Sequence, residues 1–351
     1  MSSSQLLPFA SDYMEGAHPA ILKRLAETNR TPMPGYGTDA ISEAARAKIR
    51  AACQCPDADV YFLVGGTQTN ATVIDALLAS YQGVVAADTG HVSLHEAGAI
   101  EFGGHKVLTL PHQDGKLCPD DVEAYLTAFD ADGNRDHMVM PGMVYISHPT
   151  EYGTLYTAEE LRRLHTICRA HHIPLYLDGA RLAYALACPT NDVSLPLIAE
   201  CCDAFYIGGT KCGTLFGEAV VFPKKNCAPH FFTIMKQHGA LLAKGWLLGL
   251  QFDALFTDHL YEQIGEAAIT AADAIRKALH AYGYRLFFET PTNQIFVIIP
   301  NEQLDRLTKK VSYSFWEPYD ENHTVIRLAT SWATTPEETQ QLLTVLAETA
   351  H

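Results

Sequence analysis

Two polar side chains follow apolar runs that are typical of buried strands. Lys211 lies in a glycine-rich loop between the apolar runs 204–207 and 219–222, and Asp178 ends the run 174–177. A lysine between two core strands is costly to bury unless it is paired or used covalently. Pyridoxal phosphate (PLP) needs this pair, because a lysine forms the Schiff base and a carboxylate keeps the pyridine nitrogen protonated.

A glycine-rich turn supplies the features of a phosphate site. Gly66, Thr67 and Gln68 connect the apolar run 60–64 to a helical pattern. Free N–H groups and the positive end of the helix dipole bind phosphate at such a turn. Thr210, next to Lys211, is expected to add a hydroxyl group.

Two histidines also follow predicted strands. His91 comes after the strand 83–88, and His148 comes after the strand 143–147. Side chains at the carboxyl ends of parallel strands reach a ligand crevice. His91 is therefore a candidate to cover the face of the PLP ring, and His95 lies one helical turn further on the same face.

An amino-acid substrate would also need a group that holds its carboxylate. Arginine binds a carboxylate through two parallel hydrogen bonds, and the candidates are Arg181 and Arg327.

The elements that must position these groups alternate between strand and helix from residue 60 to about 222. Continuous apolar strands are typical of parallel sheets that are covered on both faces. We therefore expect an α/β fold with about seven mostly parallel strands. After residue 240 the pattern changes to helices followed by a few strands. We expect an N-terminal arm (1–40), a large α/β domain (41–240) and a smaller α+β domain (241–351).

Composition excludes several classes of partner. The chain has 351 residues, 48% of them hydrophobic, and a formal net charge of −15. This charge argues against nucleic acid and anionic membranes as partners. The nine cysteines lack zinc-ligand spacing, so we expect reduced thiols and no metal site. With no signal peptide and no apolar run of about 20 residues, we expect a cytoplasmic protein.

Seven stretches resemble the threonine aldolase branch of the β-eliminating lyases, which have the aspartate-aminotransferase-like (type I) PLP fold. They are Ser11-Asp12, Tyr36-Gly37, Gly66-Thr-Gln-Thr-Asn70, His91-x3-His-Glu-Ala-Gly98, Asp178-Gly-Ala-Arg181, Thr210-Lys211 and Ile326-Arg-Leu328. They follow the order of the family over nearly the whole chain. The Asp-Gly-Ala-Arg and Thr-Lys stretches are the most specific of them.

The resemblance implies a role for each matching residue. Lys211 would carry PLP, Asp178 would bind its ring nitrogen, and His91 would stack on the ring. The substrate would be held by Ser11, Tyr36, His95, Arg181 and Arg327. The resemblance also implies a dimer or tetramer whose subunits complete each other's active sites, with Lys244, or alternatively Lys236, reaching the phosphate across the interface.

The chain departs from the family pattern in one loop, at His95 and at Thr210-Lys211-Cys212, where the family usually has Ser-Lys-Gly. The usual Glu-Asn-Thr-His-Asn is replaced here by Ile146-Ser-His-Pro-Thr-Glu-Tyr-Gly153, in which His148 is the candidate for the hydroxyl-binding histidine. The family usually has a tyrosine at the position of His95.

The implied reaction is PLP-dependent aldol cleavage of a β-hydroxy-α-amino acid, such as threonine, allo-threonine or phenylserine, to glycine and an aldehyde. His91, His148 or an ordered water would be the base. β-Elimination, transamination or racemisation on the same fold are alternatives, as is a non-catalytic or nucleotide-binding α/β protein. Against the last, the glycine-rich turn lacks both the dinucleotide pattern and the P-loop ending.

Overall fold

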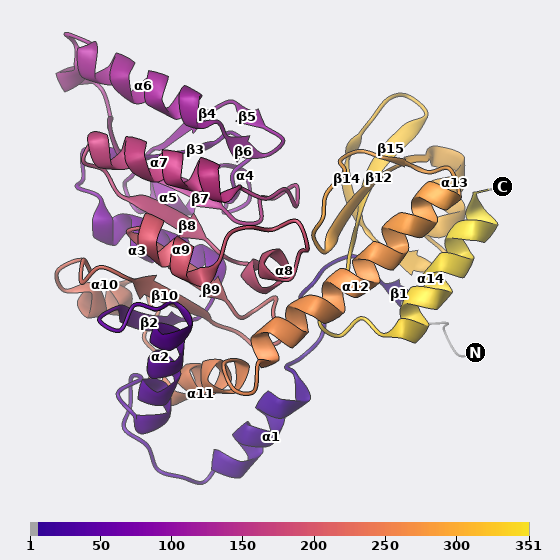
Figure 1. Ribbon diagram of the computed structural model, residues 1–351, viewed down its shortest axis with the longest axis horizontal. Helices are drawn as coiled ribbons and strands as arrows, with labels where there is room; N and C mark the ends of the chain where they lie inside the picture. The colour runs from indigo at the N-terminus through magenta and orange to yellow at the C-terminus, as the bar shows by residue number, and fades with distance from the viewer. Residues whose placement is uncertain (1–5, 351) are drawn as a thin grey trace.

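The computed structural model describes residues 6–350 and is built around a seven-stranded sheet (Figure 1). The strand order is β2-β10-β9-β8-β7-β3-β4. β10 runs antiparallel to both of its neighbours, whereas β9, β8, β7, β3 and β4 are parallel to one another. The predicted α/β fold with a mostly parallel sheet is confirmed. In chain order the strands are β2 (Asp59–Leu63), β3 (Gln82–Ala87), β4 (Val107–Leu110), β7 (Met140–Ser147), β8 (Leu175–Asp178), β9 (Ala204–Gly208) and β10 (Glu218–Phe222).

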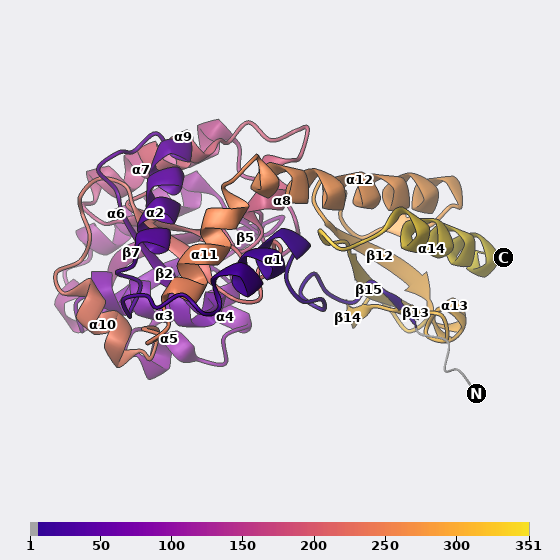
Figure 2. The same ribbon diagram turned by 90° about the horizontal axis from the view of Figure 1, so that it is seen from below.

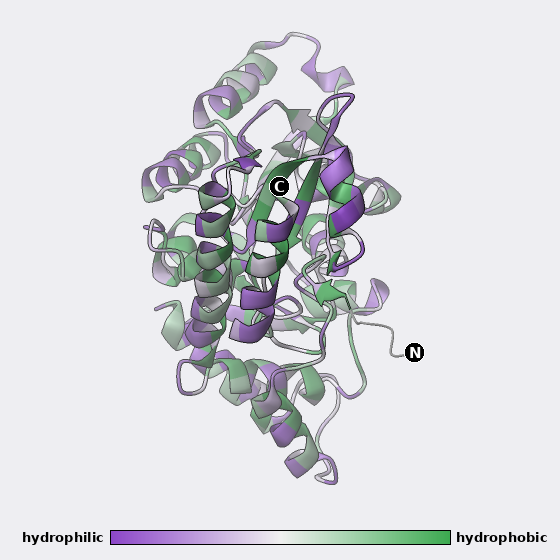
Figure 3. Ribbon diagram, turned by 90° about the vertical axis from the view of Figure 1, so that its right-hand side faces the viewer, coloured by the Kyte–Doolittle hydropathy of each residue, from purple (hydrophilic) through white to green (hydrophobic). Residues whose placement is uncertain are grey.

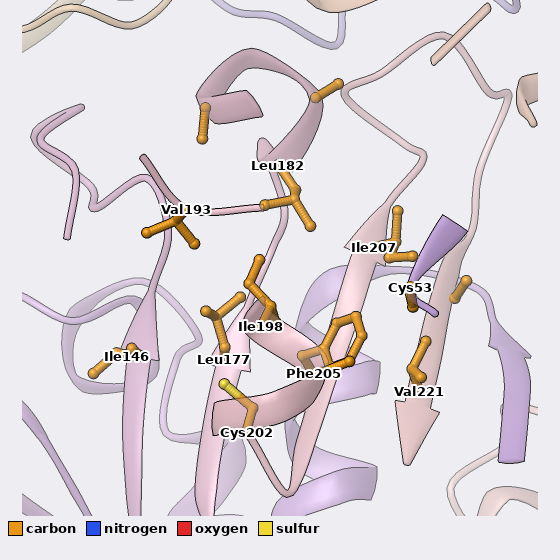
Figure 4. Close-up of a cluster of buried hydrophobic side chains, with 14 of the residues drawn as sticks. Cys53, Ile146, Leu177, Leu182, Val193, Ile198, Cys202, Phe205, Ile207 and Val221 are labelled. Carbon is orange, nitrogen blue, oxygen red and sulfur yellow. The ribbon is translucent and has the colours of Figure 1, made fainter. Parts of the chain in front are cut away.

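Helices cover both faces of this sheet. One face packs against α1 (Pro19–Thr28), α2 (Ala40–Ala52), α6 (Pro119–Ala131), α7 (Ala158–Ala170), α8 (Leu182–Leu186), α9 (Leu195–Cys201), α11 (Trp246–Leu255) and the start of α12 (Leu260–Ala281). The other face packs against α3 (Gly66–Leu77), α4 (His91–Leu94), α5 (Ala99–Phe102) and α10 (Phe231–Gln237). Strand β9 shows the alternation that builds two cores, because Phe205 and Ile207 face the first layer while Tyr206 faces the second. Figure 4 shows Leu177, Phe205, Ile207 and Val221 pointing into the first layer.

A smaller sheet lies beside the large one, and α12 runs from one part to the other (Figure 2). Its order is β11-β12-β15-β14 and all of its pairs are antiparallel. The amphipathic helices α12 and α14 pack apolar residues such as Ile275 and Leu342 against it (Figure 3). Its elements are β11 (Arg285–Leu286), β12 (Gln294–Pro300), α13 (Asn301–Leu307), β14 (Ser314–Pro318), β15 (His323–Ala329) and α14 (Pro336–Thr349).

Both ends of the described chain belong to this smaller part. β1 (Leu7–Pro8) pairs in parallel with β13 (Val311–Ser312), and Phe9 packs into the core of the small sheet. The N-terminal segment therefore crosses from the small part to α1. The division at residues 40 and 240 stays a prediction. The remaining elements are the hairpin β5 (His112–Gln113) and β6 (Lys116–Leu117) and the short 3₁₀ helix at Arg135–His137.

Two glycines let the chain segments that carry the polar groups approach each other. A Cβ on Gly179 would lie 2.1 Å from the carbonyl oxygen of Tyr206, and one on Gly208 would lie 2.3 Å from that of Ala180. The turn after β8 and the end of β9 are thus in backbone contact. Because β10 is antiparallel, its first residue, Glu218, lies at the same edge of the sheet as the carboxyl ends of β8 and β9.

Candidate active site

A cavity of about 250 Å³ opens at the carboxyl edge of the large sheet. The strand ends at β2, β3, β8 and β9 each contribute predicted residues to this cavity. The end of β7 does not contribute the predicted His148. The lining residues are Tyr13, Gly66, Thr67, His91, Ser147, Pro149, Glu151, Asp178, Ala180, Arg181, Tyr206, Thr210, Lys211 and Glu218.

Asp178 is held as a buried carboxylate. Its Oδ2 accepts hydrogen bonds from the hydroxyl of Tyr145 (2.7 Å) and the amide of Asn70 (2.9 Å), and its Oδ1 accepts one from the N–H of Ala180 (3.0 Å). Burial by itself raises the pKa of Asp178, but attraction to His91 and hydrogen bonds from Tyr206, Asn70 and Tyr145 lower that pKa overall. Asp178 is therefore ionised at neutral pH and can stabilise a protonated ring nitrogen.

His91 is positioned by two acidic side chains. Its Nδ1 lies 2.8 Å from Oε1 of Glu96, which also accepts a hydrogen bond from Asn70 (2.7 Å). Its backbone N–H donates to Oε1 of Glu151 (2.9 Å). Burial raises the pKa of Glu96, although hydrogen bonds from His91 and Asn70 oppose this shift. These contacts fix the imidazole of His91 at the wall of the cavity that Asp178 also lines.

Lys211 lies in the tight loop between β9 and β10. Burial, reinforced by the positive charge of Arg181, lowers the pKa of its amine. A larger fraction of the amine is then neutral near neutral pH, which suits a nucleophile. Glu218 lines the same cavity, and its Oε2 accepts a hydrogen bond from the N–H of Gly209 (2.9 Å). Burial raises the pKa of Glu218 to about 7.

The beginning of α3 offers unoccupied backbone donors. Gly65, its N-cap residue, is extended and provides no side-chain cap, and both Gly66 and Thr67 line the cavity. Thr210 lines the same cavity, and its hydroxyl accepts a hydrogen bond from the N–H of Gly217 (3.1 Å). Gln68 does not belong to this group, since its amide donates to the carbonyl oxygen of His238 (3.1 Å).

Arg181 faces the cavity, but one edge of its guanidinium is already used. Nε and Nη2 donate to the two carboxylate oxygens of Asp12, at 2.6 and 3.1 Å. Among residues 6–350, none accepts a hydrogen bond from Nη1. Arg327 lies outside the cavity lining and donates to Gln294 (3.0 Å) and Ser314 (3.1 Å). Burial, together with repulsion from Arg181, lowers the pKa of Arg327.

Asp12 is a buried anion whose charge is balanced by Arg181. Burial by itself would raise the pKa of Asp12, but attraction to Arg181 and Lys211 and hydrogen bonds from Arg181 and Asn293 lower it from 3.8 to about 2. A carboxyl group whose pKa is depressed by folding stabilises the protein above its unfolded-state pKa, and this stability is lost as the pH falls through the folded-state pKa. The pair therefore contributes fully above pH 3.8 and progressively less towards pH 2.

Replacing Asp12 by asparagine should lower the free energy of unfolding by about 3 kcal/mol at pH 7, because Arg181 would keep its charge without a partner. The difference between the two proteins should shrink as the pH falls from 3.8 towards 2. Urea unfolding of both proteins across this range measures it. A difference that did not change with pH would show that the ion pair does not carry the effect.

Several sequence-predicted residues lie elsewhere. The structure places His148 outside the cavity: its ring is buried, its Nδ1 accepts the N–H of Tyr156 (3.3 Å), and burial lowers its pKa to about 4. The reason is strand alternation, because Ser147 faces the cavity and the next side chain faces away. Ser11, His95, Tyr36 and Lys244 also lie outside the lining.

These four residues differ in their surroundings. The hydroxyl of Ser11 is buried without a hydrogen-bond partner. The rings of His91 and His95 have centroids 5.6 Å apart, and burial lowers the pKa of His95. Tyr36 packs under the amine of Lys236 and lines a larger cavity of about 680 Å³ between α2 and α11, which contains none of the groups described above. Lys244 is exposed.

Sequence reasoning missed the carboxylates and hydroxyls that support the site. Asn70 and Glu96 stand inside motifs that were noticed for other residues. Tyr145 and Ser147 lie on one face of β7. The alternation of side chains along a strand could have predicted that they share this face. Glu151 gave no local signal. The missed groups are Asp12, Asn70, Glu96, Tyr145, Ser147, Glu151, Tyr206 and Glu218.

The described residues contain neither a metal-binding cluster nor a membrane-spanning helix. No three histidine, cysteine, aspartate or glutamate side chains from residues 6–350 come together to hold a metal ion. No helix in this range is both long and apolar enough to cross a bilayer.

The fold is that of the type I PLP enzymes. An aspartate aminotransferase of Thermus thermophilus superposes with a TM-score of 0.70 at 15% identity, covering 98% of this chain and 91% of that one. A family model described as "Beta-eliminating lyase" matches residues 8–298. The chain belongs to this family, and it is an enzyme of the lyase class.

Two relatives are closer in sequence. A threonine aldolase of Leishmania major superposes with a TM-score of 0.95 at 42% identity, covering 98% of this chain and 99% of that one. The low specificity L-threonine aldolase of Pseudomonas aeruginosa is 29% identical over 341 residues, which is 95% of each chain.

The donor set fits PLP. The cavity joins an ionised buried carboxylate, a lysine with a lowered pKa, an imidazole on the wall and the uncapped beginning of a helix. A Cβ at Gly66 would lie 3.3 Å from the hydroxyl of Tyr206, so a side chain there would narrow the space beside the phosphate donors.

Proposed function

We propose that this protein cleaves a β-hydroxy-α-amino acid of the threonine type to glycine and an aldehyde, with PLP as cofactor. The observation that carries the proposal is the convergence of Lys211, Asp178, His91 and the start of α3 on one cavity. The similarity to threonine aldolases over nearly the full chain supports the reaction type.

Each wall of the cavity would hold a different part of the cofactor. The N–H groups at Gly66 and Thr67, with the hydroxyl of Thr210, would bind the phosphate. Asp178 would pair with the ring nitrogen, His91 would cover one face of the ring, and Lys211 would bond the aldehyde carbon. When bound, PLP supplies an electron-withdrawing ring that accepts the electron pair left on Cα when the Cα–Cβ bond breaks.

The chain's own groups position the substrate and move its protons. Arg181 lines the cavity, and its Nη1, which Asp12 does not use, would bind the substrate carboxylate. Lys211 would return a proton to Cα from its Nζ, because a lowered pKa makes its protonated amine a stronger acid than an ordinary lysine. Asp178, being ionised, keeps the positive charge on the pyridine nitrogen.

A panel of L- and D-β-hydroxy amino acids, assayed for both aldehyde and glycine, tests the proposal. Threonine, allo-threonine or phenylserine should release equal amounts of glycine and aldehyde. Pyruvate and ammonia from serine would instead identify a β-eliminating enzyme, and a colourless protein that binds no PLP would contradict the proposal altogether.

We further propose that two or more copies associate in the cytoplasm, each completing the other's site. Tyr36 and Lys244 lie outside the cavity of their own chain, and Tyr36 is exposed next to a groove lined by Phe232 and Leu241. The nine cysteines, all unpaired, support a reducing compartment. Sedimentation that detected only monomers of the PLP-bound protein at micromolar concentration would contradict the shared site.

A further inference from the structure

Glu151 lies where the loop after β7 returns to the cavity. It is buried, lines the cavity and belongs to the segment in which His148 faces away. Its Oε1 accepts hydrogen bonds from the hydroxyl of Ser147 (2.7 Å) and the N–H of His91 (2.9 Å). Among the residues that the structure describes, none donates to Oε2. One carboxylate oxygen is therefore fixed, and the other is available to a ligand.

Glu151 also closes a ring of polar contacts that includes Asp178 and His91. The ring runs from Glu151 through Ser147, Tyr145, Asp178, Asn70, Glu96 and His91 back to Glu151, and each link is 3.1 Å or shorter. No other acidic side chain in the cavity is connected to both the ring-face histidine and the pyridine-binding aspartate.

The ring fixes which oxygen of Glu151 receives a proton. While Glu151 is ionised, the hydroxyl of Ser147 and the N–H of His91 both donate to Oε1, and Tyr145 donates to Asp178. Because Oε1 already accepts two hydrogen bonds and Oε2 accepts none from the described residues, we expect an incoming proton at Oε2.

We propose that Glu151 is the catalytic base that removes the proton of the substrate's β-hydroxyl group. This inference rests on the proposed aldol cleavage. The hydroxyl proton passes to Oε2 of Glu151, and the electron pair of the O–H bond becomes the second bond of the aldehyde carbonyl. The electron pair of the Cα–Cβ bond remains on Cα, where a proton completes glycine. Glu151 then releases its proton to solvent.

The surroundings tune Glu151 for this step. Burial raises its pKa above 4.5, opposed by the Ser147 hydrogen bond and by attraction to His91. A base must be ionised to act, so activity should fall on the acidic side as Glu151 becomes protonated. The other titratable groups that face the ring or the cavity are Tyr13, His91, Glu96, Tyr145, Tyr176, Asp178, Arg181, Tyr206, Lys211 and Glu218.

Glu151→Gln separates proton transfer from hydrogen bonding. The amide oxygen can still accept from Ser147 and His91, so thermal stability and the absorbance of bound PLP should remain unchanged. Threonine cleavage should fall by about 10²–10⁴-fold, the contribution of a positioned base. Exchange of the Cα proton of glycine in deuterated water needs no β-hydroxyl base, so its rate should persist. Glu159→Gln, an exposed change on α7, is the matched control.

The pH profile supplies the second measurement. In the wild-type protein kcat should have an acidic limb, and in Glu151→Gln this limb should be absent. Ser147→Ala removes a hydrogen bond that lowers the pKa of Glu151, so it should move the limb to higher pH, and it keeps the test available if Glu151→Gln does not fold.

Three results would overturn the inference. An acidic limb that persists in Glu151→Gln would assign the base to His91 or a water. Equal loss of cleavage and glycine exchange would make Glu151 a structural residue. If Ser147→Ala did not move the acidic limb to higher pH, the limb would not report the titration of Glu151. If the wild-type protein exchanged the Cα proton of glycine but released no aldehyde from any β-hydroxy amino acid, the proposed function would fail, and this inference with it.

Discussion

Replacing Lys211 by alanine should lower the rate of aldehyde release by on the order of 10⁴-fold, the upper end of what one proton-transfer group contributes. Lys211 is the lysine that lines the cavity, where Asp178, Arg181 and Glu218 surround it. Without its amine, the chain offers no covalent bond to the cofactor aldehyde and no proton donor at Cα. The effect should exceed that of Glu151→Gln, because two functions are lost.

Covalent trapping provides a measurement that does not depend on turnover. Borohydride reduction of the wild-type protein should fix PLP to the peptide that contains Lys211, and mass spectrometry of the digested protein identifies that peptide. Lys211→Ala should show no fixed cofactor. Lys211→Arg should also fail, because a guanidinium stays protonated at any accessible pH. Lys23→Ala, an exposed change on α1, should keep both properties. Fixation of PLP at another lysine would refute the assignment.

The sequence located the groups that follow strand ends. Asp178 comes directly after an apolar run, and Lys211 and His91 follow one closely. The carboxyl ends of parallel strands meet at one edge of the sheet. The large, mostly parallel sheet and the helices and strands after residue 240 were likewise visible in local patterns. Local rules worked here because each depends on residues that are close in the chain.

The sequence failed where a side chain's direction or a distant partner decides the outcome. His148 also follows a strand, yet its ring turns away because Ser147 already faces the cavity. Gln68 belongs to the glycine-rich turn, but its amide donates a hydrogen bond to the carbonyl oxygen of His238 at the end of α10. Arg181 is paired with Asp12, which is 169 positions away in the chain. No periodicity within a single element predicts such pairings.

Glu151 shows how the structure changes the interpretation of the loop 146–153, which departs from the family pattern. That loop lacks a histidine in the expected place, which from sequence alone suggested His148 as its replacement. The chain instead turns after Pro149 and brings the carboxylate of Glu151, three residues after His148, to the cavity. A glutamate and an imidazole can both remove a hydroxyl proton, provided that the pKa lies near the working pH. Burial raises the pKa of Glu151 in this direction.

Replacing Asp178 by asparagine should lower the cleavage rate by about 10²–10³-fold, the usual effect of removing one electrostatic stabiliser. The change keeps the shape of the side chain but removes the charge that holds a proton on the pyridine nitrogen. The amide would also meet a donor in either orientation, because Oδ1 accepts from the Ala180 N–H and Oδ2 accepts from Asn70 and Tyr145. Asp178→Asn should therefore also be less stable, by about 1–3 kcal/mol.

A chemical rescue separates these two effects. Asp178→Ala leaves room for a methyl group, and PLP methylated at its ring nitrogen carries a permanent positive charge. Loaded with this analogue, Asp178→Ala should regain part of the cleavage rate while its stability stays low. The same analogue should not restore Lys211→Ala, whose defect lies at the aldehyde carbon. If the methylated cofactor gave no recovery in Asp178→Ala although it bound, the charge of Asp178 would not be what the reaction requires, and its role would be to shape the ring of hydrogen bonds around Glu151 and His91.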